Sequence, residues 1–186
     1  MVKMTEEQKQ AVLAEYETGR TVTMGSYQGK ALRWRVLGAN GKMRLLVAED
    51  VVAEQPYNEL YVDTSWRTCS LRRWLNGEFL REAFTLEELT KILNTRVSNP
   101  PNPKYYTNGG LDSVDKLFAL SIDEAEEYLP SNEARALGKW WWLRSPGNNL
   151  LSAVSVYEDG SIYVTGINDN YVDGGVRPAM WVLLRV

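Results

Sequence analysis

Alternating apolar and polar positions near the C-terminal end of the chain predict a β-hairpin. Strand side chains alternate between the two faces of a sheet with a period of two. The aliphatic residues of this stretch therefore share one face, which we expect to be buried: Val154, Val156, Ile162 and Val164. The polar and aromatic residues between them take the opposite face, which we expect to be exposed: Ser155, Tyr157, Ser161, Tyr163 and Thr165.

The register of this hairpin follows from its loop. A three-residue loop over 158–160 pairs Val156 with Ile162 and keeps the aliphatic residues on one face. A two-residue loop would pair Val156 with Tyr163 and mix the faces, because a one-residue slip turns every side chain over. Three-residue hairpin loops often end in the left-handed conformation, which suits Gly160. We therefore predict the longer loop.

Three capping boxes predict where helices begin. In this motif a Ser or Thr and a Glu or Gln three residues later satisfy each other's backbone N–H groups. The boxes are Thr5–Gln8, Thr85–Glu88 and Ser121–Glu124, and the helices are expected to end near Gly19, Thr95 and Leu129. Leu71, Trp74 and Leu75 lie at helical spacing and predict a short helix over 68–76. We interpret the first helix as docked on the domain; the alternative is a linker end or an oligomerisation helix.

The remaining elements complete a single α+β domain over residues 1–186. Strands are predicted over 31–37, 43–48 and 115–120, and turns over 25–29 and 39–41. Within the domain we distinguish the N-terminal helix, residues 1–20, from a C-terminal region, residues 140–186. Residues 98–113 are rich in Pro, Asn and Gly, and structureless loops of this length are uncommon in a compact domain. This loop is either a solvated excursion or a binding or lid loop.

Composition narrows the classes of function. Hydrophobic residues make up 44% and charged residues 24% of the chain, as in ordinary globular domains. The net charge is −3 and the pI about 5.2, which argues against nucleic-acid binding or a membrane-surface patch. The chain has no apolar run long enough to insert into a membrane and no apolar core of a signal peptide.

Several kinds of catalytic chemistry are missing from the sequence. The chain contains no histidine and one cysteine, Cys69, which we interpret as a packing residue rather than a nucleophile. Phosphate-binding loops and zinc or calcium motifs are absent, so we expect no cofactor and no metal. Acidic pairs such as Glu87–Glu88 are interpreted as solvated helix faces. Arg144 and Arg177 either tie loops together through carbonyl groups, or hold a ligand carboxylate or stack on an aromatic ring.

A series of motifs resembles a known family. In order, they are Trp34–Leu37, Tyr57–Asn58, Ser70–Asn76, Ala83–Thr85, Asp115–Phe118, Leu120–Ser121, Trp141–Gly147, Asp159–Gly160 and Gly175–Ala179. From about residue 30 onward the chain resembles a bacterial and phage family of uncharacterised domains that end in WWLRSPG and GVRPA blocks. Members of that family occur as variable proteins of diversity-generating retroelements. Met180 stands where such proteins usually have Leu, a swap that conserves volume.

The resemblance implies a C-type lectin-like fold of the formylglycine-generating-enzyme-like type. This fold would have twisted antiparallel sheets, flanking helices, and its N- and C-terminal strands in the core. A reverse transcriptase would rewrite adenine-rich codons between Gly147 and Gly175, which makes this stretch a ligand-binding surface. The implied ligand-binding residues are Asn148, Asn149, Leu150, Leu151, Ser152, Ser155, Tyr157, Ser161, Tyr163, Thr165, Asn168, Asp169, Asn170, Tyr171 and Asp173. Glu158 does not arise from an AAC codon by changes at its adenines.

The expected function is specific, non-catalytic recognition of a protein on another cell or particle. A glycan is the less favoured ligand, because the calcium and carbohydrate tripeptides of true lectins are absent. We expect a phage particle or a bacterial cell surface as the location. One alternative is an oxidative enzyme of the formylglycine-generating type, although Cys69 lacks the partner cysteine of that chemistry. The other is an invariant spacer, in which the face from Ser155 to Thr165 would be covered.

Overall fold

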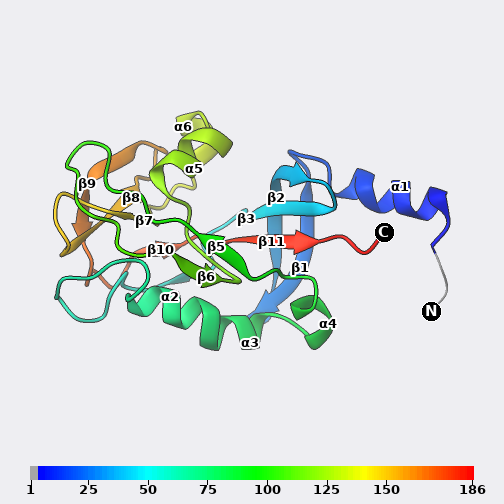
Figure 1. Ribbon diagram of the computed structural model, residues 1–186, viewed down its shortest axis with the longest axis horizontal. Helices are drawn as coiled ribbons and strands as arrows, with labels where there is room; N and C mark the ends of the chain where they lie inside the picture. Colours follow the sequence, from blue (N-terminus) through cyan, green and yellow to red (C-terminus); the bar gives the residue numbers. More distant parts are fainter. Residues whose placement is uncertain (1–3) are drawn as a thin grey trace.

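The computed structural model describes residues 4–186 and shows an α+β architecture (Figure 1). Its first sheet has the order β1-β2-β3-β11 and is antiparallel throughout. The strands are β1 (Thr21–Tyr27), β2 (Lys30–Asn40), β3 (Met43–Ala48) and β11 (Ala179–Leu183). The first and last strands of the chain therefore lie in one sheet, at its two edges.

The second sheet has the order β4-β10-β7-β8-β9. Its strands are β4 (Ala53–Glu54), β10 (Gly175–Val176), β7 (Trp141–Pro146), β8 (Ser152–Val156) and β9 (Ile162–Asn168). The short β10 pairs in parallel with β7, so the expectation of purely antiparallel sheets is wrong at this pair. A small third sheet joins β5 (Thr95–Val97) to β6 (Ser113–Asp115).

Short helices surround the sheets. They are α1 (Glu6–Glu15), α2 (Ser70–Trp74), the π-helical segment η1 (Leu75–Phe79), α3 (Leu80–Ala83), α4 (Leu86–Leu89), α5 (Ile122–Tyr128) and α6 (Asn132–Arg135). No helix within residues 4–186 is long and apolar enough to cross a membrane. Helix α1 buries none of its residues fully, and it is attached near its C-terminal end, where Arg44 donates to the carbonyl oxygen of Tyr16.

Tryptophans form much of the core. Trp34, Trp66, Trp141 and Trp142 are fully buried, and each indole N–H donates to a protein oxygen. A buried indole needs such a partner, since an unpaired N–H in the interior costs about 1–3 kcal/mol. These hydrogen bonds hold the indole rings at defined positions; we call the four tryptophans and the buried core of the two sheets the frame.

Most predicted elements are confirmed. All three capping boxes form with both hydrogen bonds, and α5 ends with Leu129 as its C-cap, as predicted. The predicted strand 43–48 has those bounds in β3, and Leu45 and Leu46 are both buried. The predicted helix over 68–76 exists, but the helical segment continues through η1 and α3 to Ala83.

Three local predictions are wrong. Residues 25–29 are not all turn: β1 reaches Tyr27, because Val22 and Met24 are buried against the frame and Gly25 takes a positive φ of 75° at a bulge. The helix after Thr85 ends at Leu89 rather than near Thr95, because the following chain pairs with β11 and β6. Such tertiary pairing overrides helix propensity.

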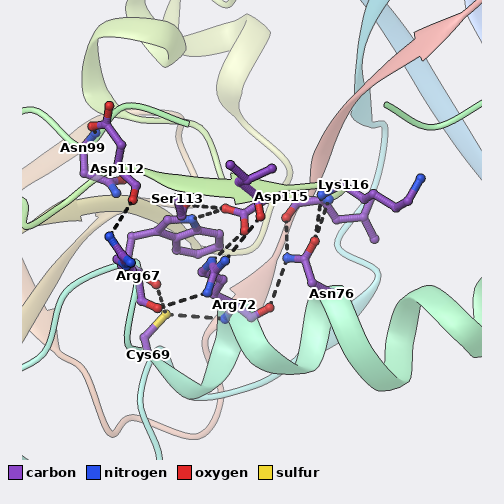
Figure 2. A network of polar contacts seen from close by, with 12 residues as sticks. Arg67, Cys69, Arg72, Asn76, Asn99, Asp112, Ser113, Asp115 and Lys116 are labelled. Carbon is purple, nitrogen blue, oxygen red and sulfur yellow. Dashed lines mark hydrogen bonds and ion pairs between the residues drawn. The ribbon is translucent and has the colours of Figure 1, made fainter. Parts of the chain in front are cut away.

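The third error concerns residues 115–120. Only Ser113–Asp115 form a strand, β6. Beyond it, the backbone N–H groups of Lys116 and Leu117 donate to the side chain of Asn76 on η1, as Figure 2 shows for Lys116. Phe118 then forms an isolated antiparallel bridge with Ala179 of β11. The backbone groups of this buried segment are thus satisfied by one side chain and one bridge, without a regular strand.

Candidate binding surface

The β8–β9 hairpin has the predicted register at its tip. Val156 pairs with Ile162, and the N–H of Tyr157 donates to the carbonyl oxygen of Ser161. Both contacts belong to the same register, so the two strands are not shifted by one residue. Gly160 has a φ of 84°, in the left-handed region. Further along, a bulge in β9 shifts the pairing to Ala153 with Ile167, so the uniform alternation predicted for both strands ends there.

Three of the predicted ligand-binding residues are buried, which corrects the expectation that their side chains are exposed. Ser155 is fully buried because β8 is an inner strand, with Trp142 of β7 on one side and Tyr163 of β9 on the other. Ser152 is buried where Gly147 approaches it closely. Asp169 is fully buried as well. Side chains in these positions belong to the frame.

The other predicted ligand-binding residues keep at least part of their surface open. They are Asn148, Asn149, Leu150, Leu151, Tyr157, Ser161, Tyr163, Thr165, Asn168, Asn170, Tyr171 and Asp173. The rings of Tyr157 and Tyr163 stack with centroids 5.0 Å apart. The expected buried face holds in β8, where Val154 and Val156 are fully buried, but Ile162 and Val164 of β9 are only half-buried.

Two loops that come earlier in the chain join this hairpin. The buried amide of Asn102 donates to the carbonyl oxygens of Pro146 and Val164, each over 2.9 Å. The hydroxyl groups of Tyr105 and Thr165 lie 3.0 Å apart. These bonds attach the loop over 98–113 to β7 and β9, so it is not a freely solvated excursion.

The second loop follows β4. The backbone N–H of Asn58 donates to Asp169, and that of Thr64 donates to Leu150. Figure 1 shows these loops and the β8–β9 hairpin at the end of the molecule opposite α1. We call the segments 58–66, 98–113, 147–151 and 157–173 together the loop surface.

The loop surface carries a group of exposed apolar side chains that the sequence analysis did not single out. They are Leu60, Tyr61, Val62, Tyr105, Tyr106 and Leu111, together with Val172 beside the predicted Tyr171. Single exposed apolar residues are normal, but a group on one surface indicates an interaction site. The signal in the sequence was an apolar triplet and a Tyr pair inside polar loops.

A shallow hollow of about 270 Å³ lies where the loops meet. Its lining comes from all three: Asp63, Thr64, Ser65, Thr68, Asn108, Gly110 and Leu150. The hollow is open to solvent, and most of the surface that lines it is apolar. Because contributions come from segments far apart in sequence, a ligand bound there would contact the two earlier loops and the hairpin together.

The carboxylate of Asp169 is buried within the loop surface, where its charged form is unfavourable. Neither carboxylate oxygen has a hydrogen-bond partner among the described residues. Burial raises the pKa of Asp169 to about 6, against the smaller opposing effect of nearby backbone N–H groups. Ser155 Oγ is likewise buried without a partner. A buried, unpaired carboxylate disfavours its charged form.

The two arginines near the ends of the C-terminal region are structural. Arg144 is buried and donates to the carbonyl oxygens of Ser98 and Ala119, and it forms an ion pair with Glu124. Arg177 donates to the carbonyl oxygen of Ala48 and lies 4.9 Å from the Trp141 ring centroid. The loop-tying interpretation is confirmed for both, and so is the position over an aromatic ring, since Arg144 lies 5.8 Å from the Phe118 ring centroid. Their burial leaves neither available to a ligand carboxylate.

Cys69 lies inside a buried polar network (Figure 2). Its Sγ accepts from the N–H of Arg72 as the N-cap of α2, and its thiol donates to the carbonyl oxygen of Trp66. Burial raises the pKa of the thiol to about 12. The thiolate, the reactive form, is therefore scarce at neutral pH. Among residues 4–186, no three His, Cys, Asp or Glu side chains form a group that could hold a metal ion.

Comparison with known proteins places the chain by family. Residues 40–184 match DUF6273, described as a domain of unknown function. The chain belongs to this family. The matched DUF6273 region begins at the end of β2 and includes the whole loop surface. No curated protein and no solved structure matches the chain.

Proposed function

We propose that this DUF6273 chain is a non-catalytic recognition protein that binds a protein ligand through its loop surface. The observation that carries the proposal is the group of partly exposed Tyr, Asn and aliphatic side chains on loops held by backbone and buried-amide hydrogen bonds. Tyr supplies a large contact area at low entropic cost, and Ser and Asn supply adaptable hydrogen bonds, as in antibody paratopes. Pre-ordered loops also lose less conformational entropy on binding.

The proposed fold is C-type lectin-like. Two features support it: the first and last strands lie in one sheet, and α1 and the C-terminal end of the chain lie on the side away from the loop surface (Figure 1). In this arrangement the chain leaves the frame, builds the recognition loops and returns to the frame through β10 and β11. The sheet pairing β3–β11 closes the return.

We also propose that a retroelement diversifies the surface. The twelve partly or fully exposed residues of the C-terminal set are the candidates, whereas Ser152, Ser155 and Asp169 are assigned to the frame. Support comes from the separation of roles: backbone groups and Asn102 make most of the bonds that join the loops, with the Tyr105–Thr165 contact as an exception. Six of the candidates are exposed: Asn148, Asn149, Asn168, Asn170, Tyr171 and Asp173. Side chains that carry no tertiary burial tolerate substitution within about 0.5 kcal/mol.

The favoured ligand is a protein on another cell or particle. The chain itself would be displayed on a phage particle or a bacterial cell surface. The mixture of aliphatic and aromatic side chains supports a protein ligand over a glycan, because protein interfaces are enriched in such anchors. The spacer alternative requires a covered face, yet Tyr157, Tyr163 and Thr165 retain open surface. The oxidative-enzyme alternative requires a reactive Cys69, and burial opposes this.

Two experiments test the proposal. For diversification, the DNA beside the gene is sequenced: we expect a near-copy of the C-terminal coding region that differs at adenines, and its absence in all close relatives contradicts this part. For binding, a photocrosslinking amino acid replaces Tyr171 and, as a control, the exposed Leu86 outside the loop surface. We expect a surface protein of a target cell to crosslink at residue 171 alone. Equal capture at both positions contradicts the recognition surface.

A further inference from the structure

A second, larger hollow of about 850 Å³ lies at the edge of the loop surface, with which it shares residues 110–113, and it is lined by three arginines. Its lining comprises Arg67, Arg72, Arg96, Gly110, Leu111, Asp112, Ser113 and Val114. Gly110 also lines the smaller hollow described above, so the two are adjacent. Three guanidinium groups thus meet in one place in a chain whose net charge is −3.

Arg72, which lines this arginine hollow, is held by several hydrogen bonds (Figure 2). Its Nε donates to Asp115 over 2.6 Å, and the fully buried carboxylate of Asp115 also accepts from Trp66 and Ser113. The terminal nitrogens of Arg72 donate to backbone carbonyls of Arg67 and Val114. The carboxylate of Asp115 is therefore occupied by these internal donors and offsets the charge of Arg72 alone.

The half-buried Asp112 pairs through its carboxylate with Arg96 and contacts Arg67 through its backbone alone. Arg96 donates to the Asp112 carboxylate through Nε and forms an ion pair with it, while its side chain stays 82% exposed. Arg67 donates only to the backbone carbonyl of Asp112, over 3.2 Å. Asp112 and Asp115 offset two of the three positive charges. The remaining guanidinium N–H groups are donors of the planar kind that bind carboxylates in pairs.

The rim of the arginine hollow is apolar. Leu111 is 71% and Val114 63% exposed. An anion with apolar neighbours matches a protein segment in which Glu or Asp alternates with aliphatic residues. Nucleic acid fits less well, because the overall acidity of the chain repels a polyanion and the hollow's rim lacks further basic residues.

We propose that the arginine hollow binds carboxylate side chains of an acidic, aliphatic segment of the protein ligand, next to the diversified contacts. This proposal deepens the proposed function and rests on it. The two parts differ in role: the arginine hollow lies outside the diversified region and gives every variant the same electrostatic contact, whereas the hairpin supplies the variable contacts. Charged contacts of this kind speed association and fix orientation.

The test uses the full chain labelled with ¹⁵N-arginine and follows Nε–Hε resonances by NMR. The probes are the peptides acetyl-Leu-Glu-Glu-Leu-amide and acetyl-Leu-Gln-Gln-Leu-amide. We expect the Glu peptide to shift Arg67 and Arg96, and to bind at least about tenfold more tightly than the Gln peptide, a difference of roughly 1.4 kcal/mol. Arg33, an exposed arginine paired with Asp50 on the first sheet, serves as the internal control.

Variants complete the test. Arg67→Gln with Arg96→Gln should abolish most of the Glu-peptide binding, Arg33→Gln should leave it unchanged, and thermal unfolding checks that all variants are folded. Equal shifts at Arg33, equal binding of the two peptides, or tighter binding of a single-stranded oligonucleotide than of the Glu peptide would overturn the proposal. Failure of crosslinking at residue 171 refutes the proposed function separately, because it leaves the peptide titration unaffected.

Discussion

The backbone N–H of Asn58 donates to the carbonyl oxygen of Asp169 over 2.9 Å, which places a buried carboxylate where two segments of the loop surface meet. Asp169 also donates its own N–H to Leu151. The main chain at this position is therefore well satisfied, while the side chain is not. The first two predictions below test whether the loops are held by their backbone and not by their side chains.

The stability of the chain should depend on pH through Asp169. Its folded pKa, about 6, lies above the ordinary value of 3.8, so folding favours the protonated form. Its contribution to stability is present below about pH 4 and is lost as the pH rises through 6. The full shift corresponds to at most about 3 kcal/mol.

Asp169→Asn should therefore be more stable than the wild type by about 1–3 kcal/mol at pH 7.5, and by much less at pH 4. Urea unfolding measures this difference in the free energy of unfolding. Asp173→Asn, at an exposed position, is the control, and an equal effect of Asp169→Asn at both pH values would contradict the assignment.

The exposed side chains of the loop surface should be replaceable as a group. Substituting Asn149, Asn168, Asn170, Tyr171 and Asp173 together by Ser should shift the melting temperature by only a few degrees, because surface changes cost little. In contrast, Ser155→Tyr should cost more than about 2 kcal/mol, because it overpacks a buried position. Differential scanning calorimetry measures both. A large loss of stability in the fivefold variant would show that these residues are part of the frame.

Gly160 should be the least replaceable residue of the hairpin. A Cβ atom there would lie 1.8 Å from the carbonyl oxygen of Asn132, and the φ of 84° is unfavourable for other residues. We expect Gly160→Ala to destabilise the fold by more than about 3 kcal/mol. Gly138 has a φ of 66° but open space around it, so Gly138→Ala should cost only the conformational term of about 1–2 kcal/mol. Similar losses in chemical denaturation would show that the contact with α6 is unimportant.

Cys69 should resist thiol reagents in the native state. Its thiol is fully buried and its pKa is raised to about 12, so a disulfide reagent at pH 8 should label it only at the rate of unfolding. Mass spectrometry after timed labelling, with protein in urea as the control, measures this rate. Rapid modification of the folded chain would instead support the oxidative-enzyme alternative.

The sequence predicts local structure well where the determining contacts are local. Capping boxes join residues three apart, and the hairpin register follows from Gly160 and from the alternation around it; both are confirmed. The burial of Ser155 was missed because it depends on strand order, which places β8 between β7 and β9. A polar residue in an inner strand looks the same in sequence as one in an edge strand.

The wider binding surface was missed for a related reason. The contact of Asn102 with Val164 and that of Asn58 with Asp169 join segments that are far apart in the chain. Periodicity carries no information about such contacts. The Pro- and Asn-rich composition of residues 98–113 did indicate a possible binding loop, and the Asn102 bonds explain its order without helix or strand.

The pairing of β11 with β3 has a consequence for folding during synthesis. Residues 43–48 emerge from the ribosome long before residues 179–183, which complete their sheet. The segments between them, the hairpin included, must be synthesised before this edge can pair, and such distant pairings are slow to form. Until then β3 is paired with β2 on one side alone, and the N–H and C=O groups of its other edge stay open to chaperones and proteases. Protection of this edge therefore comes only with β11.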